Sequence, residues 1–136
     1  MTNFKFILII AASLISSTCF GAIYTYEGTD GDGKACTFSY DLKKQKGYLV
    51  LGDLGFRPIK MKYEELYLEN YTRVLAGHVP HSDYFLIAES SINDNLDDLL
   101  STLAIVTVIE THEDHAHVWF CFNLKDSPLR NKVNFE

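Results

Sequence analysis

Short segments of alternating or uniformly apolar residues predict that most of this chain is β-strand. The segments are rich in aromatic and β-branched side chains, which suit a pleated sheet, and glycine- and aspartate-containing turns separate several of them. The predicted strands are residues 22–27, 35–42, 48–51, 84–88, 104–110 and 117–124. Most links between them are too short for the crossovers of a parallel sheet, so we expect antiparallel pairing.

The clearest hairpin lies near the end of the chain, where residues 104–110 and 117–124 flank a short polar link. The first segment is dense in isoleucine, valine and threonine, and the second alternates between two sets of side chains. One set is Val118, Phe120, Phe122 and Leu124, and the other is His117, Trp119, Cys121 and Asn123. Neighbouring strands joined by so short a loop are expected to pair.

One short helix is expected between these strands. Ser91 and Asp94 have the spacing of a capping box, and a leucine stripe follows at helical spacing. The stripe is Leu96, Leu99, Leu100 and Leu103. We predict a helix of about 8 to 12 residues that leads directly into the next strand. Residues 61–74 fit either a helix or a strand, and the neighbouring strands favour a strand.

These elements together predict a β-rich α+β fold. It consists of a small antiparallel sheet or barrel-like sandwich with one or two short helices.

The first 21 residues are predicted to be a secretory signal peptide. Lys5 precedes an apolar run of roughly 10 residues, and small residues at Cys19 and Gly21 fit cleavage before Ala22. The run is shorter than the roughly 20 residues that span a bilayer, so no transmembrane segment is expected in the mature chain. The alternatives are a buried N-terminal helix and lipid attachment at Cys19. We expect residues 22–136 to form one β-rich domain, with a loose tail at 125–136.

Cleavage would leave two cysteines, Cys36 and Cys121. Exported proteins normally meet an oxidising compartment, so we predict that these two form a disulfide. Closing a loop of about 85 residues would stabilise the fold by about 4 to 5 kcal/mol in the chain-entropy model. The predicted localisation is periplasmic or secreted.

The chain is acidic, with 12 basic and 18 acidic residues and a formal charge of −6. Loss of Lys5 with the signal peptide would leave 11 basic residues against 18 acidic ones, a charge of −7. This balance disfavours binding to nucleic acid and favours basic partners or cations.

Histidine is concentrated in the link of the terminal hairpin. His115 and His117 are two residues apart, so on a strand their side chains would lie on one face. Imidazole and carboxylate groups held at a turn can bind zinc or copper. The candidate ligands are His112, Asp114, His115 and His117. The alternative is a solvated loop, since the spacing matches no zinc signature; His78 and His81 would join only if their loop were adjacent.

No catalytic motif is present. The segment from Asp30 to Lys34 resembles the start of a calcium loop, but Lys34 stands where an oxygen ligand is required, and a turn is expected instead. A nucleophile elbow and a phosphate-binding glycine loop are absent. A hydrolase of unrecognised type is therefore the third-ranked function.

Tyrosine is abundant, with eight residues in the chain. A candidate partner surface of acidic and aromatic side chains is Tyr63, Glu64, Tyr67 and Tyr71; the alternative is that these tyrosines pack on the sheet. The leading prediction is an exported, non-catalytic binding protein, of inhibitor-like or envelope-interaction type, whose partner is another protein of basic character. The second is a divalent transition-metal-binding protein that uses the histidine loop.

Overall fold

The computed structural model describes residues 23–67, 70–112 and 114–126. The predicted signal peptide lies outside these residues. The described chain forms ten strands and one short helix. The strands are β1 (Ile23–Thr29), β2 (Ala35–Asp41), β3 (Lys46–Leu51), β4 (Leu54–Gly55), β5 (Ile59–Lys60), β6 (Lys62–Tyr67), β7 (Tyr71–His78), β8 (Tyr84–Ser90), β9 (Leu103–Thr111) and β10 (Ala116–Asp126), and the helix is α2 (Leu96–Ser101).

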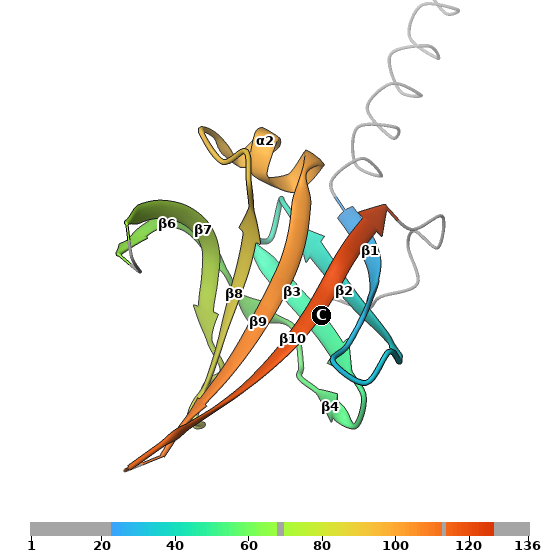
Figure 1. Ribbon diagram of the computed structural model, residues 1–136. Helices are drawn as coiled ribbons and strands as arrows, with labels where there is room; N and C mark the ends of the chain where they lie inside the picture. The colour runs from blue at the N-terminus through green and yellow to red at the C-terminus, as the bar shows by residue number, and fades with distance from the viewer. Residues whose placement is uncertain (1–22, 68–69, 113, 127–136) are drawn as a thin grey trace, which may run out of the picture.

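All strands belong to one antiparallel sheet that curls into a half-barrel (Figure 1), which confirms the predicted fold class. The strand order is β4-β3-β2-β1-β10-β9-β8-β7-β6, and β5 pairs with β3. Consecutive strands pair with each other except around β5, which pairs with β3 as β4 does and is followed by β6 at the opposite edge of the sheet. The first and last strands, β1 and β10, pair in the middle of the sheet. The helix α2 lies at one end of the half-barrel, and the β9–β10 hairpin projects from the opposite end.

The main core fills the inside of the curl. Phe38, Leu49, Leu86 and Val108 are fully buried there, each on a strand whose alternate residues face inward. The segment 61–74 is strand and not helix, as predicted, but it contributes to two strands. These are β6 and β7, which pair with each other.

One chain segment spans the opening of the curl. Met61 lies between β5, which pairs with β3, and β6, which pairs with β7. Its backbone N–H donates to the Gln45 carbonyl at 2.9 Å and its carbonyl accepts from the Tyr40 hydroxyl at 3.0 Å. A Cβ on Gly77 would lie 2.2 Å from the Lys60 carbonyl oxygen, so glycine allows β7 to approach this segment.

The helix differs from its prediction in start and length. Asn95, and not Ser91, is the N-cap, and its side chain accepts a hydrogen bond from the Asp98 N–H at 2.8 Å. An Asn at this position satisfies an otherwise unpaired backbone donor. The helix ends after six residues. Leu103, the last residue of the predicted leucine stripe, is the first residue of β9.

A bulge in β10 changes which side chains face the core. Glu27 pairs with Lys125 and Thr29 with Phe122, so two residues of β10 oppose one of β1, and Asn123 has a φ of 54°. Cys121 and Leu124 therefore both face inward. Lys125 and Asp126 belong to β10, so the predicted loose tail begins two residues too early; residues 127–136 lie outside the described part.

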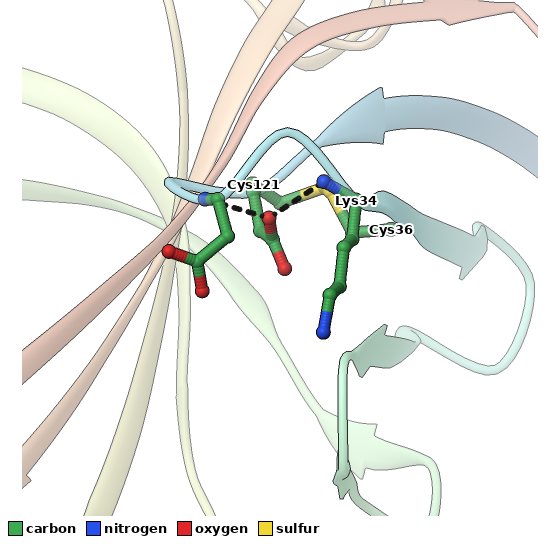
Figure 2. Close-up of a disulfide and its surroundings, with 5 residues drawn as sticks. Lys34, Cys36 and Cys121 are labelled. Carbon is green, nitrogen blue, oxygen red and sulfur yellow. Dashed lines mark hydrogen bonds between the residues drawn. A yellow bond between two sulfur atoms is a disulfide. The ribbon is translucent and has the colours of Figure 1, made fainter.

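Cys36 and Cys121 form a disulfide, as the sequence predicts. Figure 2 shows it beside Lys34, at the turn between β1 and β2. The bond joins β2 to β10 across the intervening strand β1, in which Gly28 pairs with Cys36. A Cβ on Gly28 in β1 would lie 2.2 Å from the Phe122 carbonyl oxygen, so glycine allows the three strands to approach one another here.

Two buried tyrosines are expected to make stability fall at alkaline pH. Burial raises the pKa of Tyr40 to about 12 and also raises that of Tyr26. The unfolded chain ionises at its ordinary value near 10, so the stabilisation is complete below that pH. It is lost as the pH rises from about 10 towards the folded-state values.

Ultraviolet absorbance measures tyrosinate and can follow this loss beside urea unfolding. We expect Tyr26 and Tyr40 to ionise only well above pH 10, as the structure melts. A single ionisation step near pH 10 without loss of structure would contradict this assignment.

Candidate functional site

Three histidines gather at the tip of the β9–β10 hairpin. The loop is tight, because the His112 N–H donates to the His115 carbonyl at 2.8 Å and Ala116 pairs with Thr111. The ring centroids of His112 and His115 are 5.3 Å apart, those of His112 and His117 are 5.8 Å apart, and those of His115 and His117 are 5.0 Å apart. All three rings therefore contact one another.

Glu110 lies at the base of this cluster. It pairs with His117 across the two strands, and its Oε1 lies 3.1 Å from Nε2 of His112. A hydrogen bond from Tyr84 lowers the pKa of Glu110, and contact with His112 and His117 lowers it further. The carboxylate is thus held in its charged form beside the imidazoles.

Aromatic rings connect the histidines to the core. His117 stacks on Trp119 with ring centroids 5.9 Å apart, and Trp119 lies 6.2 Å from Tyr84. Tyr84 in turn lies 5.1 Å from Phe56. The inner face of the half-barrel therefore continues past the core as a row of rings that ends in the histidine cluster.

Asp114, the fourth predicted ligand, lies beside this cluster. Asp114 lines an open hollow of about 690 Å³ together with Asp83, Thr111, His112 and His115. The β7–β8 loop is adjacent, since the Thr111 N–H donates to the Asp83 carbonyl at 3.2 Å.

Within residues 23–67, 70–112 and 114–126, no three His, Cys, Asp or Glu side chains are already arranged to hold a metal ion. The histidine cluster is therefore not a preformed metal site with the rings as they stand.

A second apolar cluster lies on the outer face of the sheet, behind the main core. It consists of the buried Val74, Ala76 and Ile87 and the partly buried Leu66, Phe85 and Ile109. Paired residues on neighbouring strands share a face. Ile109 pairs with both Phe85 and Val118, and Thr107 pairs with both Ile87 and Phe120. The cluster thus continues onto the outer face of β10.

The outer face of β10 is exposed. Val118 is 45% exposed and Phe120 is 38% exposed, and the Phe120 and Phe122 rings stack with centroids 5.2 Å apart. We call Val118, Phe120 and Phe122 the β10 strip.

Acidic turns border the β10 strip. A hollow of about 420 Å³ is lined by the strip, by the β1–β2 turn with Asp30, Asp32 and Lys34, and by the β3–β4 turn with Asp53. The Asp30 carboxylate accepts hydrogen bonds from the backbone N–H groups of Asp32 and Lys34, both at 2.9 Å, which Figure 2 shows as dashed lines. The predicted turn is therefore built around Asp30, and the hollow carries three aspartates against one lysine.

The candidate tyrosine surface is divided between the two faces of β6. Tyr63 packs against the main core and its hydroxyl donates to the Asn93 carbonyl. Glu64 is exposed on the opposite face, as alternation along a strand requires. Tyr67 is 66% exposed and pairs with Tyr71; the Tyr71 side chain lies outside the described structure.

Sequence reasoning missed two features of these surfaces. Glu110 was assigned only to a strand, although its place opposite His117 follows from the hairpin register. The exposure of Phe120 was missed because the sequence analysis did not assign its set of alternating side chains, Val118, Phe120, Phe122 and Leu124, to either face of the sheet. One signal was available, since residues 104–110 are apolar on both faces and a strand of that kind normally lies between two layers.

Comparison of the chain with protein-family models, curated proteins and solved structures finds no match. In the described residues, no helix is both long enough and apolar enough to cross a bilayer.

Proposed function

We propose that this protein is an exported, non-catalytic binding protein, periplasmic or secreted, that binds a basic protein partner on the β10 strip. One observation carries the proposal: a continuous apolar outer face ends at exposed side chains on β10, directly beside the acidic turns. The Cys36–Cys121 disulfide supports the localisation, because such bonds persist in oxidising compartments.

The chemistry of the strip defines the expected partner. Exposed aromatic and branched side chains gain free energy when a partner removes them from water, and aromatic residues are enriched in interface cores. Asp30, Asp32 and Asp53 attract lysine and arginine at the rim of such an interface. A partner that presents apolar side chains flanked by basic ones matches both parts.

Site-specific photo-cross-linking tests this proposal in the native envelope. A benzophenone side chain at Val118 is expected to capture one protein with a basic surface, and a benzophenone at Ile92 serves as the matched control. Ile92 is 50% exposed but lies in the segment before α2, at the other end of the sheet. The same product from both positions, or no product from Val118, would overturn the proposal.

Measured affinity for the captured protein then tests the apolar strip and the acidic turns independently. Phe120→Asp is expected to weaken binding by at least about 30-fold, the loss typical of an interface hot spot. Asp30→Asn with Asp53→Asn is expected to slow association and to reduce its dependence on salt. An unchanged affinity for the Phe120→Asp variant would contradict a docking role for the strip.

Sedimentation distinguishes a partner from self-association. The purified protein is expected to be a monomer at micromolar concentration. A dimer that dissociates in the Phe120→Asp variant would mean that a second copy covers the strip, and would overturn the proposal of a basic partner.

A further inference from the structure

We propose that the tip of the β9–β10 hairpin binds one divalent transition ion, zinc or copper, through His112, His115 and His117, with Glu110 as the fourth ligand. The histidine rings continue the inner face of the half-barrel, whereas the β10 strip lies on its outer face. The two surfaces share Trp119, which stacks on His117 and also lines the hollow beside the strip.

The spacing of the rings matches the geometry of a three-histidine site. Imidazoles that bind one zinc ion tetrahedrally, with Zn–N bonds of about 2 Å, place their ring centroids about 5 Å apart. The three distances here are 5.0, 5.3 and 5.8 Å. The centroids therefore already have the spacing of a three-histidine site, and rotation of the rings is what must bring one nitrogen of each to a common ion.

The backbone holds the three positions while the rings can turn. The hydrogen bond from His112 to the His115 carbonyl fixes the loop, and the pairing of His117 with Glu110 fixes the strands. The His112 side chain is 42% exposed, and His115 and His117 are also exposed. Rotation about their side-chain bonds meets little steric resistance, so an ion can bring the nitrogens together.

Glu110 is better placed than Asp114 to complete the site. Its carboxylate already contacts Nε2 of His112 at 3.1 Å, and its side chain is only 19% exposed. Tyr84 pairs with Glu110 across β8 and β9, and its hydrogen bond to the carboxylate helps to orient it. Support of a ligand by a second residue in this way is usual at metal sites. Tyr84 is therefore a positioning residue.

The ligand types select the ion. Three neutral imidazoles and one carboxylate suit zinc and copper, whereas magnesium and calcium require mainly oxygen ligands. The site carries one negative ligand, and Asp83 and Asp114 nearby add negative charge that attracts a cation.

Trp119 gives a direct signal for binding. It is the single tryptophan of the chain, and its ring lies 5.9 Å from that of His117. Bound copper(II) quenches the fluorescence of a nearby indole, so the ion reports its own position.

The test uses untagged, disulfide-bonded protein freed of metal with a chelator. Titration with zinc or copper(II), in competition with a chromophoric chelator, is expected to give one ion per chain and a Kd below about 1 µM. Copper(II) is expected to quench Trp119 at the same stoichiometry, and magnesium and calcium are expected to compete with neither ion.

Variants decide whether the ion occupies this cluster. His117→Ala is expected to weaken binding by at least about 100-fold, because loss of a ligand exceeds the 10- to 100-fold loss typical of second-sphere changes. Glu110→Gln is expected to weaken it less than His117→Ala, and Tyr84→Phe by about tenfold. The His78→Ala/His81→Ala variant removes the two exposed histidines of the adjacent β7–β8 segment. It is the control and is expected to bind as the native chain does, because the four proposed ligands all belong to β9, β10 and the loop between them.

Near-UV circular dichroism establishes that each variant is folded, and the exposed positions of the substituted histidines make this the expected result for the histidine variants. A Kd of the native protein weaker than about 100 µM would overturn the proposal. So would a loss of less than about tenfold in His117→Ala, or equal losses in His117→Ala and the control variant.

Discussion

Removal of the disulfide, by Cys36→Ala with Cys121→Ala, is expected to lower the free energy of unfolding by about 4 to 5 kcal/mol. The bond closes a loop with a sequence separation of 85 residues, and its loss releases that constraint in the unfolded chain. A domain of this size has a total stability of about 5 to 15 kcal/mol. The variant is therefore expected to be marginally folded.

Urea unfolding of the oxidised protein and of the double variant measures this difference. The native protein reduced with a phosphine serves as the control, because it lacks the bond but keeps both sulfur atoms in the core. Agreement between the reduced protein and the double variant would assign the loss to the cross-link. A difference of less than about 2 kcal/mol between the oxidised and reduced proteins would contradict the expected contribution.

The disulfide also shows why part of the fold could be predicted from the sequence. Removal of the predicted signal peptide would leave two cysteines, which allow one pairing, and strands repeat with a period of two residues, so both features follow from local rules. The β-rich class and the terminal hairpin depend on the same rules. Neither required knowledge of which distant segments meet.

The parts that were missed depend on long-range contacts. The passage of Met61 across the opening of the curl is set by pairing with β3 on one side and β7 on the other, which no local pattern encodes. The bulge at Asn123 is similar, since it depends on how β1 meets β10. Ser91 was predicted as the helix cap because Asp94 follows it three positions later. Asn95 has the same spacing to Asp98, so this local pattern does not identify which of the two caps the helix.

The candidate surfaces divide in the same way. The spacing of His115 and His117 predicts a shared face for two residues on one strand, but His115 precedes β10, which begins at Ala116. The contacts of His115 with His117 and His112 therefore depend on the turn. The interleaved tyrosines and glutamates of residues 63–71 suggested one surface, but interleaving in a strand separates neighbours onto opposite faces. The β10 strip is exposed because the alternate side chains of β10, Trp119 and Cys121, face the main core.

Two phenylalanines test this assignment of faces. Phe38 in β2 is 0% exposed inside the curl, and Phe120 in β10 is 38% exposed on the outer face. Phe38→Ala is expected to lower the free energy of unfolding by about 3 to 5 kcal/mol, because it removes the buried ring and leaves a cavity. Phe120→Ala is expected to cost less than about 1 kcal/mol, since the ring gains less from burial in the folded chain.

Urea unfolding with the disulfide intact measures both variants under the same conditions. Equal losses would mean that Phe120 is as important to the isolated fold as Phe38, and the strip would then be part of the core and not a surface. Gly47 gives a further control, because a Cβ at this position would lie 3.1 Å from the Phe38 ring. The Cβ would also lie 2.3 Å from the Met61 sulfur, which can move into the space that the Phe38 ring vacates. Gly47→Ala is therefore expected to destabilise the Phe38→Ala variant less than it destabilises the native chain.

A large apolar side chain that is more than a third exposed stabilises its own chain less than a buried one does, and its exposure beside other apolar side chains is typical of an interaction surface. If Phe120→Ala leaves stability nearly unchanged while Phe120→Asp removes binding of the cross-linked partner, stability and recognition lie on opposite faces of one sheet. Phe38, Leu49 and Val108 then hold the half-barrel from inside, and the outer face of β10 is free to be specified by the partner.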